Sequence, residues 1–169
     1  TGKNSFKSLP ISSINMNSTS IELGDGSFEN CSNLQNVKLE ASSILKMGEK
    51  CFSGDKSIDT NKFELLGTEI NIGKNCFTNC LSILFLTLQN SNQIFIDDNA
   101  FEGCINLESI TAHSKSVFHA GLNCFNKLNK LKTVRITSKN VNIRGSCFAC
   151  CSSLSSFSIS GSEDAFIHE

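Results

Sequence analysis

A repeat of about 24 residues constrains the fold of this chain more than any other feature of its sequence. Six blocks carry a Phe in the same context, and successive Phe residues are separated by 24, 25, 24, 24 and 23 positions. They are Phe28, Phe52, Phe77, Phe101, Phe125 and Phe148. Together with five further positions in register with each Phe, 35 of 36 sites are apolar, although apolar residues make up only 39% of the chain. Asn61 is the single exception, so the repeat is not an accident of composition.

The pattern within one unit predicts two short strands and a turn. Apolar-x-apolar pairs flank each Phe, for example Ile70/Ile72 and Leu86/Leu88 around Phe77, and this period of two is typical of β-strands. Two residues after four of the Phe residues comes Asn or Gly, which accept a left-handed backbone, so we expect a single helical turn to end there. One unit cannot bury its own apolar face. We therefore expect the units to stack, with parallel strands about 4.8 Å apart.

The motif G-x-x-[AC]-F-x-x-C-x-x-L-x-x-[VI]-x-[LI] resembles the BspA-like leucine-rich repeats over roughly residues 21–160. The resemblance implies a leucine-rich-repeat solenoid of six ~24-residue repeats, with parallel strands on a concave face, short helical turns and short second strands. It also implies a binding role. Proteins of this type usually lie on cell surfaces, and some are adhesins.

The ends and the second unit depart from the pattern. Residues 1–20 are predicted to be a partial repeat or irregular lead-in, in which Phe6, Leu9 and Ile11 match the strand segment of a preceding unit. Residues 161–169 are predicted to begin a truncated further repeat, with Phe166 and His168 in its first strand. We expect a fragment of a longer array whose last residues are weakly held. In the second unit, Asn61 replaces a strand aliphatic and residues 64–69 contain an extra residue.

The nine cysteines follow the repeat. One column immediately precedes the Phe and another lies three residues after it, with Asp55 and Leu128 replacing Cys in the second column. Both columns call for a small buried side chain, and free Cys packs as a small hydrophobe. Only Cys150 lies off the pattern, where we expect an exposed thiol. Cys147 and Cys150 form a formal C-x-x-C, but no βαβ setting or second ligand pair accompanies it and no His pairs with a Cys in a known spacing, so we predict no metal and no cofactor.

Composition and charge exclude several other functions. A net charge of −1 argues against nucleic acid as the main partner, and no apolar run reaches the roughly 18 residues that a membrane-spanning helix needs. No nucleophile is placed beside a base, so we predict that the chain is not an enzyme.

Strand alternation predicts which residues face outward on the concave sheet. If Val37 and Leu39 point inward, the middle outward column is predicted to contain Lys38, Lys62, Thr87, Thr111, Arg135 and Ser158. The adjoining columns contain Phe85 and His113. The face is polar and basic at one end, with Phe85 as its large apolar group. The binding residues predicted on it are Lys38, Lys62, Phe85, Thr87, Thr111, His113 and Arg135. Exposed aromatic residues and Arg are common interface anchors, so Phe85 and Arg135 rank first.

Two functions fit these observations. The first is a secreted or cell-surface antigen or adhesin module that binds a host protein or another partner protein through its concave face. The alternative is an intracellular scaffold or structural array, which the unpaired, buried thiols favour. An open strand at the C-terminal end would also permit end-to-end self-association.

Overall fold

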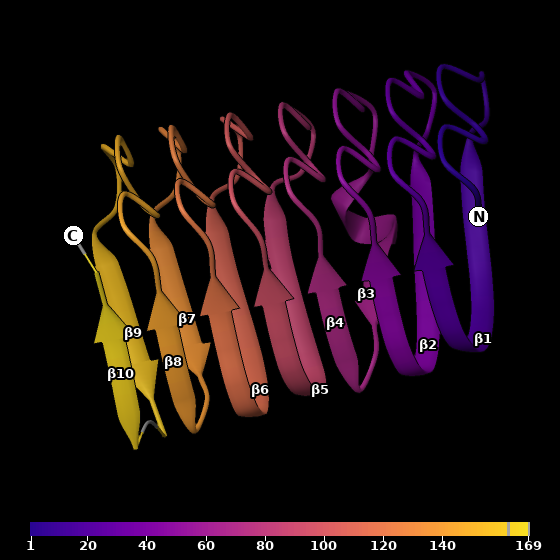
Figure 1. The fold of residues 1–169 in the computed structure, drawn as a ribbon. Coiled ribbons are helices and arrows are strands. Elements are labelled where there is room, and N and C mark those ends of the chain that lie inside the picture. The colour runs from indigo at the N-terminus through magenta and orange to yellow at the C-terminus, as the bar shows by residue number, and fades with distance from the viewer. Residues whose placement is uncertain (162, 169) are drawn as a thin grey trace.

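A computed structural model describes residues 1–161 and 163–168 as ten strands and one short 3₁₀ helix (Figure 1). The elements are β1 (Ser13–Leu23), β2 (Asn36–Met47), η1 (Thr60–Lys62), β3 (Phe63–Leu66), β4 (Glu69–Ile72), β5 (Phe85–Ile96), β6 (Ser109–Ala120), β7 (Thr133–Thr137), β8 (Asn140–Ile143), β9 (Ser156–Ser160) and β10 (Asp164–Ile167). The strands pair in parallel with equivalent strands of neighbouring units. The predicted parallel-strand solenoid is confirmed.

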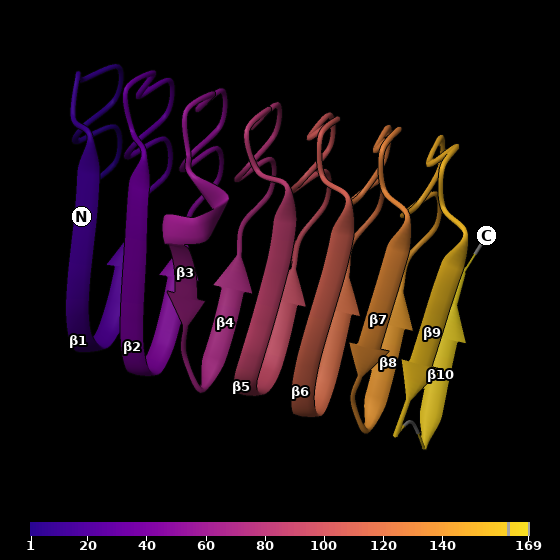
Figure 2. The ribbon, with the colours of Figure 1, turned by 180° about the vertical axis from the view of Figure 1, so that it is seen from behind.

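Each unit descends one side of the stack, bends and returns up the other side, as Figures 1 and 2 show from opposite directions. In four units, a single strand of 11 or 12 residues forms both the descending and the ascending part; these strands are β1, β2, β5 and β6. Elsewhere it is divided into the pairs β3/β4, β7/β8 and β9/β10. We call the descending strands and strand halves, which follow the Phe turns, the first sheet, and the ascending ones the second sheet.

The core lies between the two sheets and beneath the turns. In the strands between the two ends of the stack, most of the alternate residues that point inward are buried, as the period of two predicts, and they include Val37 and Leu39 of the first sheet and Ile70 and Ile72 of the second. Beneath the turns, seven Phe rings from Phe6 to Phe148 form a continuous stack with centroids 5.0–5.4 Å apart. This Phe ladder joins every unit to its neighbours.

The helical turns predicted after each Phe are not present, because the turns are interrupted by left-handed residues. The predicted positions, two after each Phe, do have a positive φ of 58–80°. A second residue, two before each Phe, also has a positive φ of 52–60°. With two such residues in each turn, alternate backbone N–H groups point along the stack, and those between them donate back to the residue three before, as Glu29 N does to Gly26 O at 3.1 Å. For example, Phe28 N donates to Cys51 O at 2.8 Å and Phe52 N donates to Cys76 O at 2.8 Å.

The second unit has a different register from the one predicted. Phe63 and Leu65 lie opposite Val37 and Leu39, so Asn61 occupies no strand position and instead lies in η1. The additional residues therefore precede β3 rather than follow it. They are accommodated by η1, whose first turn is capped by the Asp59 side chain accepting from Asn61 N at 3.0 Å. Among the described strands, β3 is hydrogen-bonded to β2 and not to β5, so the first sheet is interrupted there.

Both ends also differ from the sequence prediction. Phe6 is the first ring of the Phe ladder, and Ile14 and Met16 take the inward positions of a preceding unit opposite Val37 and Leu39. Residues 13–20, predicted to be irregular, therefore belong to β1. At the other end, Ala165 and Ile167 align with Val141 and Ile143, whereas Phe166 points outward. Phe166 and Ile167 are both exposed at this end of the stack.

Candidate functional site

The first sheet presents a polar outer face. Thr87, Thr111 and Arg135 lie in one column across β5, β6 and β7, with Ser158 of β9 next along. The adjoining columns bring Phe85 beside Ser109, and His113 beside Thr137. We call this surface the first-sheet face.

Lys62 does not belong to the first-sheet face as predicted. Because of the insertion before β3, Glu64 takes the position beside Lys38, and Lys62 lies in η1 with its ammonium 3.7 Å from Asp59. Lys38 is held by two carboxylates, with its Nζ 3.1 Å from Glu40 Oε1 and 3.4 Å from Glu64 Oε2. The basic end predicted for this face is therefore neutralised.

Arg135 and Phe85 retain the features expected of ligand contacts. Arg135 is exposed and forms no ion pair with residues 1–161 or 163–168. Phe85 is 46% exposed on a surface otherwise formed mainly by small polar residues. Beside Arg135, a shallow hollow of about 350 Å³ is lined by Gln89, Asn90, Thr111, Ala112, His113, Arg135 and Thr137.

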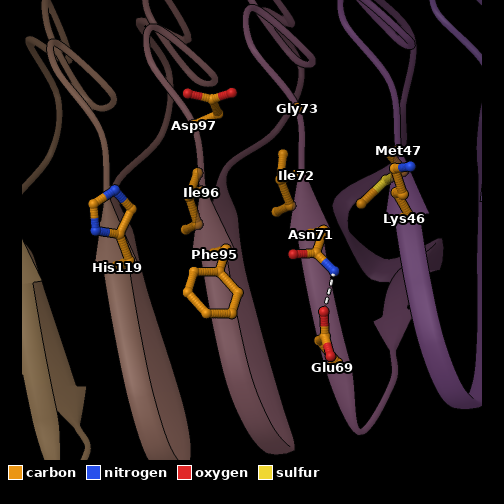
Figure 3. Close-up of a pocket in the computed structure, with 10 residues that line it drawn as sticks. All are labelled: Lys46, Met47, Glu69, Asn71, Ile72, Gly73, Phe95, Ile96, Asp97 and His119. Atoms are coloured by element: carbon orange, nitrogen blue, oxygen red, sulfur yellow. Dashed lines mark hydrogen bonds between the residues drawn. The ribbon is translucent and has the colours of Figure 1, made fainter.

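The second sheet carries a larger hollow that the sequence analysis did not identify. Its volume is about 580 Å³, and Figure 3 shows Phe95 at its centre with His119 alongside. The two rings lie 6.4 Å apart between centroids, on the paired strands β5 and β6. Lys46, Glu69, Asn71 and Asp97 also line the hollow. The sequence contained a signal for this face, because Phe95 and His119 alternate with the inward pairs Ile94/Ile96 and Phe118/Ala120.

Local interactions set the charge of the side chains that line this second-sheet hollow. Lys46 is engaged by Glu22 at 2.6 Å, and Glu69 accepts from the Asn71 amide at 2.7 Å. Burial, reinforced by the positive charge of Arg144, lowers the pKa of His119 below its usual range. At neutral pH the His119 ring is therefore uncharged and adds to the aromatic surface.

Most of the cysteines lie in the core, as the repeat predicts. Seven are buried, Cys151 is half-buried and Cys150 is exposed; all nine are free thiols. In the column after the Phe, the thiol donates to a Phe carbonyl of an earlier unit, as Cys80 Sγ does to Phe52 O at 3.1 Å and Cys104 Sγ does to Phe77 O at 3.0 Å. Burial raises the pKa of Cys104 to about 12, which suits a packing role rather than a reactive one.

Asp55 is the chemical exception in this column. It is fully buried, and neither carboxylate oxygen has a hydrogen-bond partner in the described part of the chain. Burial raises its pKa to about 8. Within that part, no group of three or more His, Cys, Asp and Glu residues has an arrangement that could hold a metal ion.

Comparison with protein families supports the repeat assignment. The BspA type leucine-rich repeat region matches in six copies, over residues 1–91 and 69–166. The chain belongs to the BspA-type leucine-rich repeat family. Searches of curated proteins and of solved structures found no match.

Membership of the BspA-type family agrees with the geometry of the surfaces. Leucine-rich-repeat solenoids of this kind are protein-interaction modules, and both outer faces of this stack present ordered columns of side chains. Among the residues that the structure describes, no helix is long and apolar enough to cross a membrane.

Proposed function

We propose that this chain is a non-enzymatic protein-binding module of a cell-surface or secreted antigen or adhesin, and that its first-sheet face contacts the partner. The observation that carries the proposal is the exposed pair of Phe85 and Arg135 on a sheet of small polar side chains. A rigid sheet holds such anchors in place without ordering a loop, which reduces the entropic cost of binding.

The two anchors supply different parts of the binding free energy. Burial of a Phe side chain is worth about 1.5–3 kcal/mol, and Phe85 has nearly half of its surface available for it. Arg135 is free to form paired hydrogen bonds with a carboxylate. Lys38, Thr87, Thr111 and His113 would form the surrounding polar contacts, and Lys62, in η1, would lie at the margin.

The surface location rests on the family, many of whose proteins are extracellular. An intracellular scaffold is the second candidate, and the nine free thiols favour it, because secreted proteins commonly oxidise their cysteines. Antibody labelling of intact, unpermeabilised cells that express the protein separates the two. Labelling before permeabilisation supports the surface module, and labelling only afterwards supports the scaffold.

Selection from a phage-displayed library of 12-residue peptides tests the binding function itself. We expect the folded chain to enrich peptides that contact the first-sheet face. Phe85→Ala should weaken their binding about 10-fold or more, whereas Ser158→Ala on the same face should change it less than 2-fold. Failure of the chain to enrich any peptide would count against a protein-binding module. If the enriched peptides bind the Phe85→Ala and Arg135→Ala variants as tightly as they bind wild type, the first-sheet face is not the binding surface.

A further inference from the structure

One backbone column of the repeat is glycine except where the chain carries Asp97, Arg144 and His168. Residues of this column follow the second strand of each unit and donate their N–H to the preceding unit. Asp97 N donates to Ile72 O at 2.9 Å, Gly121 N to Ile96 O at 2.8 Å and Arg144 N to Ala120 O at 2.9 Å. The glycines of the column are Gly24, Gly48, Gly73 and Gly121.

Steric crowding explains the glycines. A Cβ added to Gly73 would lie 2.6 Å from Met47 O, and one added to Gly121 would lie 2.6 Å from Asp98 N. Asp97 and Arg144 nevertheless carry side chains in this column. Asp97 gains a local hydrogen bond from Asp98 N at 2.7 Å, but neither Asp97 nor Arg144 forms an ion pair within residues 1–161 and 163–168. A residue that departs from the repeat pattern without gaining a stabilising contact is expected to serve a function.

Asp97 lies two residues beyond Phe95 at the end of β5, and Arg144 lies two residues beyond Asn142, which is paired with His119. Asp97 lines the hollow of about 580 Å³ shown in Figure 3, and Arg144 lines a second hollow of about 390 Å³. The two hollows meet at His119, which lines both. We call the two adjoining hollows together the second-sheet groove. Asp97 and Arg144 belong to units two steps apart, which corresponds to about 10 Å between their backbones.

The charge of the second-sheet groove reverses along its length. Asp97 makes one end acidic, because Lys46 is engaged by Glu22, whereas Glu69 lies four residues lower along the strand direction, opposite Gln93. Arg144 makes the other end basic, and His168 lies beside it. Between them, Phe95 and the neutral His119 ring offer an apolar surface.

We propose that the second-sheet groove binds an extended segment of a partner protein in which a basic, an apolar and an acidic side chain occur at alternate positions. In an extended chain, side chains at i, i+2 and i+4 share one face and span about 13 Å, which the long Arg144 side chain can match. The basic group meets Asp97, the apolar group packs on Phe95 and His119, and the acidic group pairs with Arg144. This site lies on the second sheet, opposite the first-sheet face. It rests on the proposed protein-binding function only in that its ligand is taken to be a segment of a protein.

Restoring the repeat glycine gives a test variant whose fold should survive. In the double variant Asp97→Gly/Arg144→Gly, we expect the melting temperature to stay within about 3 °C or to rise, because two crowded Cβ atoms are removed. Peptides that are enriched from the phage-displayed 12-residue library and compete for this groove should bind the variant at least 10-fold more weakly. Phe85→Ala, on the first-sheet face, is the matched control and should leave their binding unchanged.

The charge-swapped variant Asp97→Arg/Arg144→Asp gives the sharper result. Wild-type chain should enrich peptides with one order of basic-x-apolar-x-acidic residues along the sequence, and the swapped chain should enrich the reverse order. Peptides that bind wild type through Phe85 and Arg135, with no dependence on positions 97 and 144, would overturn the groove proposal and leave the proposed function standing. Enrichment of no peptide at all would overturn both. A large loss of melting temperature in the glycine variant would assign Asp97 and Arg144 to stability and overturn the inference.

Discussion

At the scale of single residues, Asp55 shows how one polar substitution is tolerated inside the repeat. It stands in a column whose other members are Cys or Leu128, and it is fully buried without a hydrogen-bond partner in the described part of the chain. An ionised carboxylate is strongly disfavoured there, so the folded protein holds Asp55 protonated up to a pKa of about 8.

This protonation makes the stability of the protein depend on pH. Between pH 4 and pH 8 the unfolded chain releases the Asp55 proton and the folded chain keeps it, so Asp55 destabilises the fold progressively as the pH rises. We expect Asp55→Cys, which restores the column residue, to change the free energy of unfolding little at pH 4 and to raise it by about 3–5 kcal/mol at pH 8. Urea unfolding at both pH values measures this. A gain that does not vary with pH would contradict the assignment.

At the scale of the element, the Phe ladder beneath the turns stabilises the stack. Phe77 is fully buried, with Phe52 and Phe101 stacked at 5.2 and 5.0 Å and Phe63 edge-on at 5.4 Å. Removing its ring leaves a cavity shared by three units. We therefore expect Phe77→Ala to lower the free energy of unfolding by about 3–5 kcal/mol, and the exposed Thr87→Ala to lower it by less than about 1 kcal/mol. Equal shifts in the urea midpoint would mean that the register of the core is wrong.

The elements also show what the sequence could predict and where it could not. The period of two identified the inward columns, and the Asn and Gly residues after four of the Phe residues correctly indicated left-handed backbone. The helical turn was wrong because the second left-handed position, two before each Phe, was not considered. The register of β3 was misread because Phe63 is apolar in either alignment, and only the position of η1 shows that Leu65 completes the inward pair. The second-sheet groove was missed because alternation was applied to the first sheet alone.

At the scale of the whole molecule, the two ends of the stack expose strand edges. Among the strands that the structure describes, β10 pairs only with β8, and all four of its residues are exposed. Exposed parallel edges present unpaired backbone groups, and β1 offers the complementary edge at the other end. End-to-end association of two copies therefore remains our proposal for how this chain behaves at high concentration.

Amide hydrogen exchange tests the state of these edges. We expect residues 163–168 to exchange at least 100-fold faster than the central strands β5 and β6, because local opening there exposes little additional apolar surface. Protection of this segment should increase with protein concentration if copies associate end to end. Strong protection that is independent of concentration would show that Ile167 is already sealed within one molecule.

The central claim is that parallel strands about 24 residues apart form each sheet, in the register that aligns the two outer faces. Interstrand backbone nuclear Overhauser contacts measured on the isotope-labelled chain test it most directly. We predict parallel-strand contacts between Thr111 and Arg135, between His119 and Asn142, and between Lys38 and Glu64. Contacts of an antiparallel hairpin, or a contact of Lys38 with Lys62 in place of Glu64, would contradict the register on which both proposed binding surfaces depend.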